Sequence, residues 1–177
     1  MKNWYLLQCQ IQNFQKVVCT LDAFNIENYF PLETKISRRK DCNAQRITHK
    51  PLFPGYLFVR FDPEVTHTTK ITDIPGASAF VKFGQMPRAV SEDIIQTLKC
   101  APLLMVNSDD NSVSCRNLPT PIRDKVLFIY SIKNVIERQV ALLHFLEKDS
   151  ELNKFTRDGG KLFTAMTTHT PHLPLSA

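Results

Sequence analysis

The residues with the clearest chemical potential are basic, and they gather between positions 35 and 50. Asp41 is the one acidic residue in that window, and Lys and Arg side chains are the groups that contact nucleic-acid phosphates. A charge run of this kind is more often a solvated hairpin tip or mobile loop, so both interpretations stay open. The set is Lys35, Arg38, Arg39, Lys40, Arg46, His49 and Lys50.

Residue patterns for catalysis are missing from the sequence. It has no glycine-rich phosphate loop, no Gly-x-Ser-x-Gly and no His-Glu-x-x-His, and its carboxylates are scattered. The cysteines form no Cys-x-x-Cys pair and lie at no metal-ligand spacing from a histidine, so we expect reduced structural thiols. The sequence therefore predicts no enzyme activity, no cofactor and no metal site. The thiols are Cys9, Cys19, Cys42, Cys100 and Cys115.

The segment Pro51–Phe61 carries the strongest apolar signal. Pro54-Gly55 predicts a turn, and the aromatic and β-branched residues after it predict a strand that is apolar on both faces. One apolar face would be buried by the core of the strand's own domain, and the second would need to be buried by another domain or another protein. A central strand covered on both sides by its own fold is the alternative.

Length and composition bound the remaining possibilities. A chain of 177 residues can form one good core and a small second unit. No apolar run approaches the roughly 18 residues of a membrane span, and the N-terminus has no signal-peptide pattern, so we expect a cytoplasmic protein without membrane contact. The net charge of +5, most of it in residues 1–100, suits a polyanionic partner.

Strands and helices alternate along residues 1–100, which predicts an α/β (α+β) domain. Strands are expected at 4–10, 27–37, 56–62 and 77–83. An amphipathic helix is expected over 14–24 with Asn13 as its N-cap, a short helix or turn over 66–72, and a second helix from Ser91 to Cys100.

The second half of the chain changes character at residue 101. Polar residues flanked by prolines predict a linker over 101–121, and a small C-terminal domain over 122–163 follows. Residues 126–132 are compatible with a strand, whereas helical spacing and propensity favour helix over 132–148. The Thr-, His- and Pro-rich end, 164–177, predicts disorder.

Several blocks together resemble the N-terminal domain of the NusG family of transcription elongation factors. The similarity covers roughly residues 1–100, and its His-Thr-Thr element looks like the specialised RfaH branch. It implies an antiparallel sheet flanked by helices. The blocks are Trp4-Tyr5, Pro51–Phe61, Phe61–Val65, His67-Thr68-Thr69 and the Gly-x-x-x-Phe-Val-x-Phe-Gly-x-x-Pro pattern of Gly76–Pro87.

The resemblance implies two contacts with RNA polymerase. Tyr56, Phe58 and Phe83 match the apolar surface that grips the clamp helices of the largest subunit, although Gln8 stands where an aromatic residue is common. The two Phe residues are equally compatible with a core position. His67, Thr68 and Thr69 match the contact to the gate loop of the second-largest subunit, and a polar helix start is their alternative interpretation.

The resemblance also implies contact with non-template DNA. The RfaH branch reads DNA with side chains of its first helix and of the Pro75-Gly76 turn. Phosphate contacts from the basic hairpin would position the DNA without reading its sequence. The candidates are Gln10, Gln12, Asn13, Lys16, Thr20, Arg38, Arg39, Lys40 and Asp73.

The NusG family usually ends in a small β-barrel of the KOW type, whereas RfaH-like proteins can hold this domain as a helical hairpin. No glycine lies between Gly84 and Gly159, which favours the hairpin. We expect its apolar stripe to cover the aromatic surface and inhibit polymerase binding, with Lys50 facing Glu137, Glu147 or Glu151. The stripe is Val135, Ile136, Val140, Leu143 and Leu146.

Together these features predict a monomeric elongation and antitermination factor that bridges the two polymerase lobes and suppresses pausing. A ribosomal protein is a further expected partner of the C-terminal domain. The alternative function is a nucleic-acid-binding module that uses the basic hairpin without polymerase.

Overall fold

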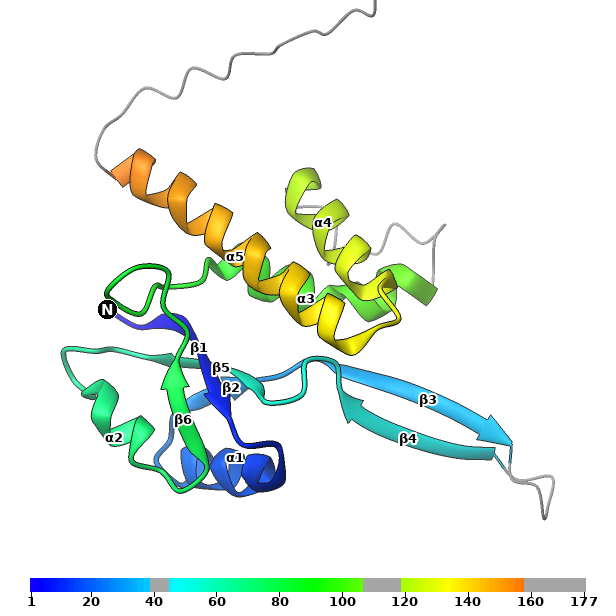
Figure 1. Cartoon of the computed structure of the whole chain (residues 1–177), viewed down its shortest axis with the longest axis horizontal. Helices are drawn as coiled ribbons and strands as arrows, with labels where there is room; N and C mark the ends of the chain where they lie inside the picture. The colour runs from blue at the N-terminus through cyan, green and yellow to red at the C-terminus, as the bar shows by residue number, and fades with distance from the viewer. Residues whose placement is uncertain (39–44, 107–118, 158–177) are drawn as a thin grey trace, which may run out of the picture.

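A computed structural model describes residues 1–38, 45–106 and 119–157 of the chain. Its centre is a four-stranded antiparallel sheet in the order β2-β5-β1-β6 (Figure 1). The strands are β1 Asn3–Cys9, β2 Glu27–Tyr29, β5 Tyr56–Phe61 and β6 Ala77–Phe80. An antiparallel sheet flanked by helices is the fold that we predicted for residues 1–100.

The two faces of the sheet belong to two separate apolar cores. Along β1, Trp4 and Leu6 point to one core, whereas Tyr5 and Leu7 point to the other, as the two-residue period of a strand requires. The central strand β5 divides in the same way, with Phe58 on the first side and Leu57 on the second. The prediction that β5 is apolar on both faces is therefore confirmed.

One face of the sheet is covered by α1, Phe14–Ala23, which follows the short 3-10 helix η1, Ile11–Asn13. Four apolar side chains of α1 are buried at helical spacing, so the predicted amphipathic helix is confirmed. Asn13 is the N-cap residue of α1, as predicted, but its side chain makes no capping bond and instead donates to the side chain of Gln10. The buried residues are Phe14, Val17, Val18 and Leu21.

Strands β3, Leu32–Arg38, and β4, Gln45–Pro51, form a two-stranded ribbon that projects from the domain (Figure 1). The predicted strand over 27–37 is thus two strands, β2 and β3. The break falls at Pro31, whose nitrogen cannot donate a hydrogen bond to a sheet neighbour. Within the stretch 38–49, which we predicted as a hairpin tip or loop, Arg38 and residues 45–49 lie in the ribbon, whereas residues 39–44, with Arg39 and Lys40, lie outside the described residues.

Three helices pack near the other face of the sheet: α3, Glu92–Val106, α4, Thr120–Ser131, and α5, Val135–Arg157. The strand considered for 126–132 is wrong, because those residues lie mostly in α4. Helix α3 extends six residues beyond Cys100, into the predicted linker, and the described part of the C-terminal region is helical. No helix in the described ranges is long and apolar enough to cross a membrane.

Candidate functional site

The candidate polymerase surface lies where β1 and β5 face the C-terminal helices. Leu6 pairs with Phe58 and Gln8 pairs with Tyr56 in the antiparallel register, so these four side chains share one face. Phe58 is 0% exposed, whereas Tyr56 and Phe83 are half-buried at the rim of the same core. The structure therefore brings the three predicted aromatic residues into one cluster and makes Phe58 a core residue.

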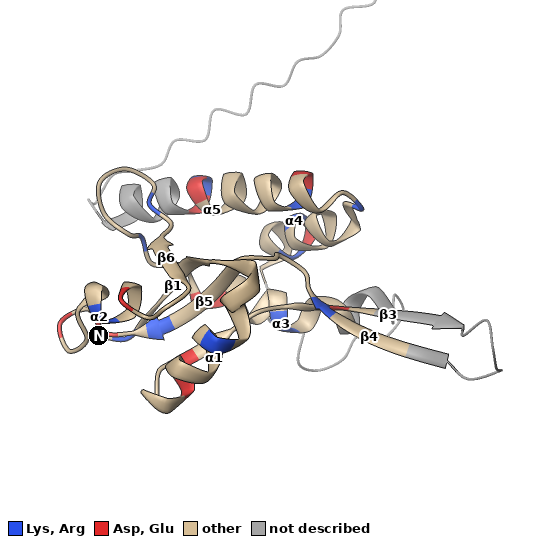
Figure 2. Cartoon of the chain, turned by 60° about the horizontal axis from the view of Figure 1, so that its bottom comes forward, with Lys and Arg blue, Asp and Glu red and all other residues tan. Residues whose placement is uncertain are grey.

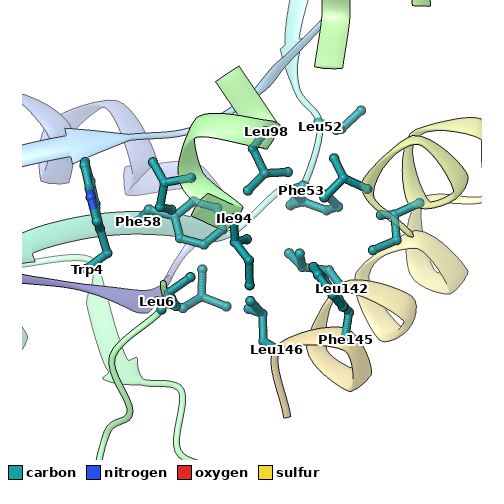
Figure 3. Close-up of a cluster of buried hydrophobic side chains, with 14 of the residues drawn as sticks. Trp4, Leu6, Leu52, Phe53, Phe58, Ile94, Leu98, Leu142, Phe145 and Leu146 are labelled. Atoms are coloured by element: carbon teal, nitrogen blue, oxygen red, sulfur yellow. The ribbon is translucent and has the colours of Figure 1, made fainter. Parts of the chain in front are cut away.

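Helices α3, α4 and α5 share the core that contains this cluster. Ile94 and Leu98 of α3 lie beside Phe58, and Leu146 of α5 lies near Leu6 (Figure 3). Helix α5 also contributes Leu142 and Phe145, and α4 contributes Val126 and Ile129. The connection between β4 and β5 adds the buried Leu52 and Phe53. The apolar face that could receive a partner helix is thus occupied by helices of the same chain.

The face of α5 that packs against the domain differs from the predicted stripe. Of that stripe, Leu146 is buried and Leu143 is half-buried, but Val135 is 39%, Ile136 71% and Val140 60% exposed. The buried face instead follows Arg138, Leu142, Phe145 and Leu146, at intervals of four, three and one. Apolar residues occur on several sides of α5, so their spacing alone did not indicate which side of the helix is buried.

Two polar contacts at the rim join α5 to the domain. The guanidinium of Arg138, 3% exposed as a residue, lies 3.5 Å from the Glu33 carboxylate of β3. The amide of Gln139 donates to the backbone oxygen of Pro54 at 2.7 Å. Lys50, which we expected to supply the ion pair, is exposed and is the cross-strand neighbour of Glu33. No sequence pattern indicated Arg138, because a basic residue in a helix normally faces solvent.

His67, Thr68 and Thr69 begin the short helix α2, Thr68–Thr72. The Nδ1 atom of His67 accepts the backbone N–H of Thr69 at 3.3 Å and lies 2.9 Å from the Thr69 hydroxyl. This is the polar helix start that we named as the alternative. With Nδ1 as an acceptor, the ring N–H is on Nε2 of this exposed residue and could donate a hydrogen bond to a partner carbonyl.

Five of the candidate DNA residues, at positions 10, 12, 13, 16 and 20, lie around η1 and α1, on the opposite side of the sheet. Gln10, Gln12 and Lys16 are exposed, and the backbone N–H of Gln10 donates to the Gly76 oxygen at 2.8 Å. A Cβ on Gly76 would lie 2.4 Å from the Cβ of Asn13, and the φ of Gly76 is +102°. Glycine is therefore required for the turn to approach this closely.

Three of the DNA candidates lie on α1, at the end of α2 and on β3. Thr20 donates its hydroxyl to the Lys16 backbone oxygen, and Asp73 is the exposed C-cap of α2. Arg38 ends β3. Lys and Arg residues of the described chain are spread over several elements and mixed with acidic residues (Figure 2). The structure thus brings the start of α1 and the 75–76 turn together, but it forms no single basic face from the described residues.

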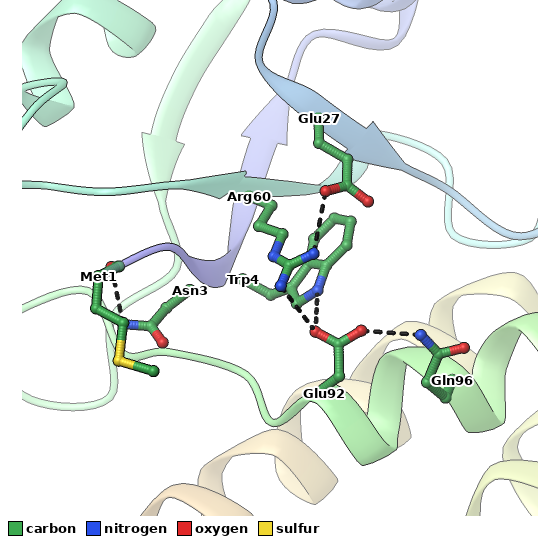
Figure 4. A network of polar contacts seen from close by, with 7 residues as sticks. All are labelled: Met1, Asn3, Trp4, Glu27, Arg60, Glu92 and Gln96. Atoms are coloured by element: carbon green, nitrogen blue, oxygen red, sulfur yellow. Dashed lines mark hydrogen bonds and ion pairs between the residues drawn. The ribbon is translucent and has the colours of Figure 1, made fainter.

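Trp4, part of the first sequence block, has a structural role that the sequence did not reveal. Its indole N–H donates to Glu92 at 2.9 Å, and Arg60 links Glu92 to Glu27 (Figure 4). Burial acts to raise the pKa of Glu92, but hydrogen bonds and the Arg60 charge outweigh it, so the pKa lies below its usual range. This network attaches α3 to the sheet.

Thiols and metal ligands add no second site to the described part of the chain. Cys9 and Cys19 are free thiols, and burial raises the pKa of Cys9 to about 12. Cys100 is half-buried in α3. No group of three or more His, Cys, Asp or Glu residues suited to a metal occurs among the described residues. Cys42 and Cys115 lie outside them.

Comparison with known proteins identifies the domain. Residues 2–99, more than half of the chain, match the family model described as NusG, transcription termination factor nusG. A solved structure titled "Domain interaction in Thermotoga maritima NusG" is 21% identical, with a TM-score of 0.36, and the match covers 56% of this chain and 56% of that chain. The chain therefore belongs to the NusG family of transcription factors.

Proposed function

We propose that this protein is an RfaH-like specialised member of the family, which binds RNA polymerase during elongation and suppresses pausing and termination. The observation that supports the proposal is that Leu6 and Phe58, on one apolar face of the sheet, share a buried core with side chains of α4 and α5 as well as of α3. A factor that acts on every transcript needs no such cover, whereas a factor recruited to selected transcripts benefits from it.

The proposed clamp contact uses the same face after the two helices leave. Displacing α4 and α5 would uncover more of the half-buried Tyr56 and Phe83 at the rim of the core and form an apolar surface on a rigid sheet. Such a surface suits helix-in-groove binding, with aromatic side chains as anchors. The chain's own helices and the helices of the polymerase clamp would then compete for one site.

The second proposed contact is made by the α2 start at His67–Thr69. Its exposed His67 ring N–H and Thr69 hydroxyl suit hydrogen bonds to the backbone of the polymerase gate loop. Binding two lobes of one enzyme raises the effective concentration of each contact and disfavours the opened clamp. The factor would thus act by binding rather than by chemistry.

Recruitment by DNA is proposed to involve the exposed end of α1. Gln10 and Gln12 amides can hydrogen-bond unpaired bases of the non-template strand, and Lys16 can contact phosphate. Basic residues of the β3–β4 ribbon would add phosphate contacts. We place this activity in the cytoplasm, where transcription occurs, with a monomer as the active form. After release, the C-terminal region would be free for a ribosomal partner, as a hairpin or as a barrel.

A nucleic-acid-binding module that acts without polymerase is the second candidate, favoured by the projection of the ribbon away from the domain (Figure 1). Passing the full chain over immobilised core polymerase and over DNA of matched charge separates the two. Retention on polymerase, increased by variants that open the α5 interface, supports the elongation factor. Retention on DNA alone, unaffected by those variants, supports the module.

A further inference from the structure

Helix α3 contains a defect in its backbone hydrogen bonding. Pro102 lies inside α3 and has no N–H group. In a regular α-helix that N–H would donate to the carbonyl four residues earlier, which here belongs to Leu98. Leu98 is fully buried, so its oxygen needs another donor or a water molecule.

The missing donor comes from α4. The Tyr130 hydroxyl donates to the Leu98 backbone oxygen at 3.0 Å, although the two residues lie 32 positions apart in the chain. Val126 and Ile129 are buried in the core that also contains Leu98, so α4 is held against α3 around this bond. The side chain thus replaces the backbone bond that the proline removes.

Tyr29 of β2 and Tyr130 of α4 both lie half-buried at the edge of the core that contains Leu98. Burial raises the pKa of Tyr29 to about 12 and that of Tyr130 above its usual range. The Tyr130 hydroxyl is protonated at neutral pH, as an ordinary tyrosine is, and remains a donor to the Leu98 oxygen.

We propose that Pro102 and Tyr130 form a latch that selects one docked position of the C-terminal helices. Pro102 leaves an acceptor on α3, and α4 satisfies it only when Tyr130 reaches Leu98. A slip of α4 by one turn, about 5.4 Å, would bury the carbonyl without a partner. When the helices undock, water reaches the carbonyl, so the bond favours the docked state specifically. The inference depends on the undocking step of the proposed function, and Tyr130 acts as a positioning residue.

A double-mutant cycle on the full chain tests the latch without polymerase. Hydrogen exchange of the α4 amides, residues 120–131, measures how often the helix undocks. In the native background Y130F should increase this exchange about tenfold or more, because a buried acceptor loses its donor. In P102A the new backbone N–H can bond to Leu98, so adding Y130F should change the exchange much less. Y5F removes a tyrosine hydroxyl in the other core and is the matched control.

Exchange of the β1 and β5 amides separates undocking from global unfolding. The latch predicts that Y130F leaves those amides protected while α4 is deprotected. Unchanged α4 exchange in Y130F overturns the proposal, as does an equal Y130F effect in both backgrounds. If P102A disturbs α3, the comparison of Y130F with Y5F still decides, because equal α4 exchange in the two rejects the latch. A failure of polymerase binding would leave these results unaffected, so the two proposals are tested separately.

Discussion

The ion pair between Arg138 and Glu33 should control how tightly α5 is docked. The Arg138 side chain is 4% and the Glu33 side chain 46% exposed, with a separation of 3.5 Å. Within the described residues, the Arg138 Nε atom is buried without a hydrogen-bond partner. Docking thus takes a guanidinium out of water and depends on one carboxylate to compensate for it.

The expected magnitude lies between two limits. An exposed ion pair contributes about 0–1 kcal/mol, whereas removing one partner of a fully buried pair costs about 3–5 kcal/mol. Only Arg138 is buried here and its pair is long, so E33Q should weaken docking by about 1–2 kcal/mol, which is about a five- to thirtyfold change in the docking equilibrium. R138E places two carboxylates together and should weaken docking further.

Two quantities measure this effect in the full chain: the hydrogen-exchange rate of residues 135–149 and the affinity for core polymerase. E33Q and R138E should increase the exchange rate and the affinity, and the charge-swapped variant E33R/R138E should recover part of the native protection. E27Q removes a carboxylate from an exposed pair with Arg60 and is the matched control for the change in charge. Native protection of α5 in R138E would refute the assigned role of this pair.

Three further predictions concern the binding surfaces and the turn at Gly76. Y56A should weaken polymerase binding by about 1–3 kcal/mol with the fold intact, whereas F58A should lower the free energy of unfolding by about 3–5 kcal/mol. Binding assays and calorimetry distinguish the two roles, and native polymerase affinity in Y56A would exclude Tyr56 from the site. Charge reversal of residues 38–40 should weaken recruitment to an elongation complex and reduce the slope of log affinity against log salt concentration by about 0.9 for each phosphate no longer neutralised. An unchanged slope would mean that these residues contact solvent rather than phosphate. G76A should destabilise the domain by about 2–4 kcal/mol, because the new Cβ would clash with residues at the start of α1. G84A has the same positive φ but open space around it, so it should cost only about 1 kcal/mol. Equal losses of unfolding free energy in urea melts would contradict this.

The sheet was predictable because its strands have strong local signals. The Pro54-Gly55 turn and the apolar residues after it specify β5, and the buried positions 14, 17, 18 and 21 specify α1. The predicted strand boundaries were wrong where a single residue interrupts a strand-like pattern, as Pro31 does by separating β2 from β3. Pro31 itself was the signal for that break, since a proline within a run of strand residues argues against one continuous strand.

The docking surface was only partly predictable, for a different reason. From the sequence, Phe58 was equally compatible with a core position and with an exposed surface, and in the structure it lies in the core. On α5, Ile136 and Val140 were as suitable for burial as Leu142 and Phe145, and the domain's surface decided between them. Side-chain periodicity describes one helix, whereas burial depends on what the helix packs against.

The most direct test of the central claim compares the polymerase affinity of the full chain with that of residues 1–106. Circular dichroism and a cooperative melt establish first that the shorter chain is folded. If α4 and α5 cover the clamp-binding surface, the shorter chain should bind core polymerase at least about tenfold more tightly, because no displacement is required. Y56A in the shorter chain should remove most of that gain. Equal affinity of the two folded chains would contradict masking of the surface by the C-terminal helices.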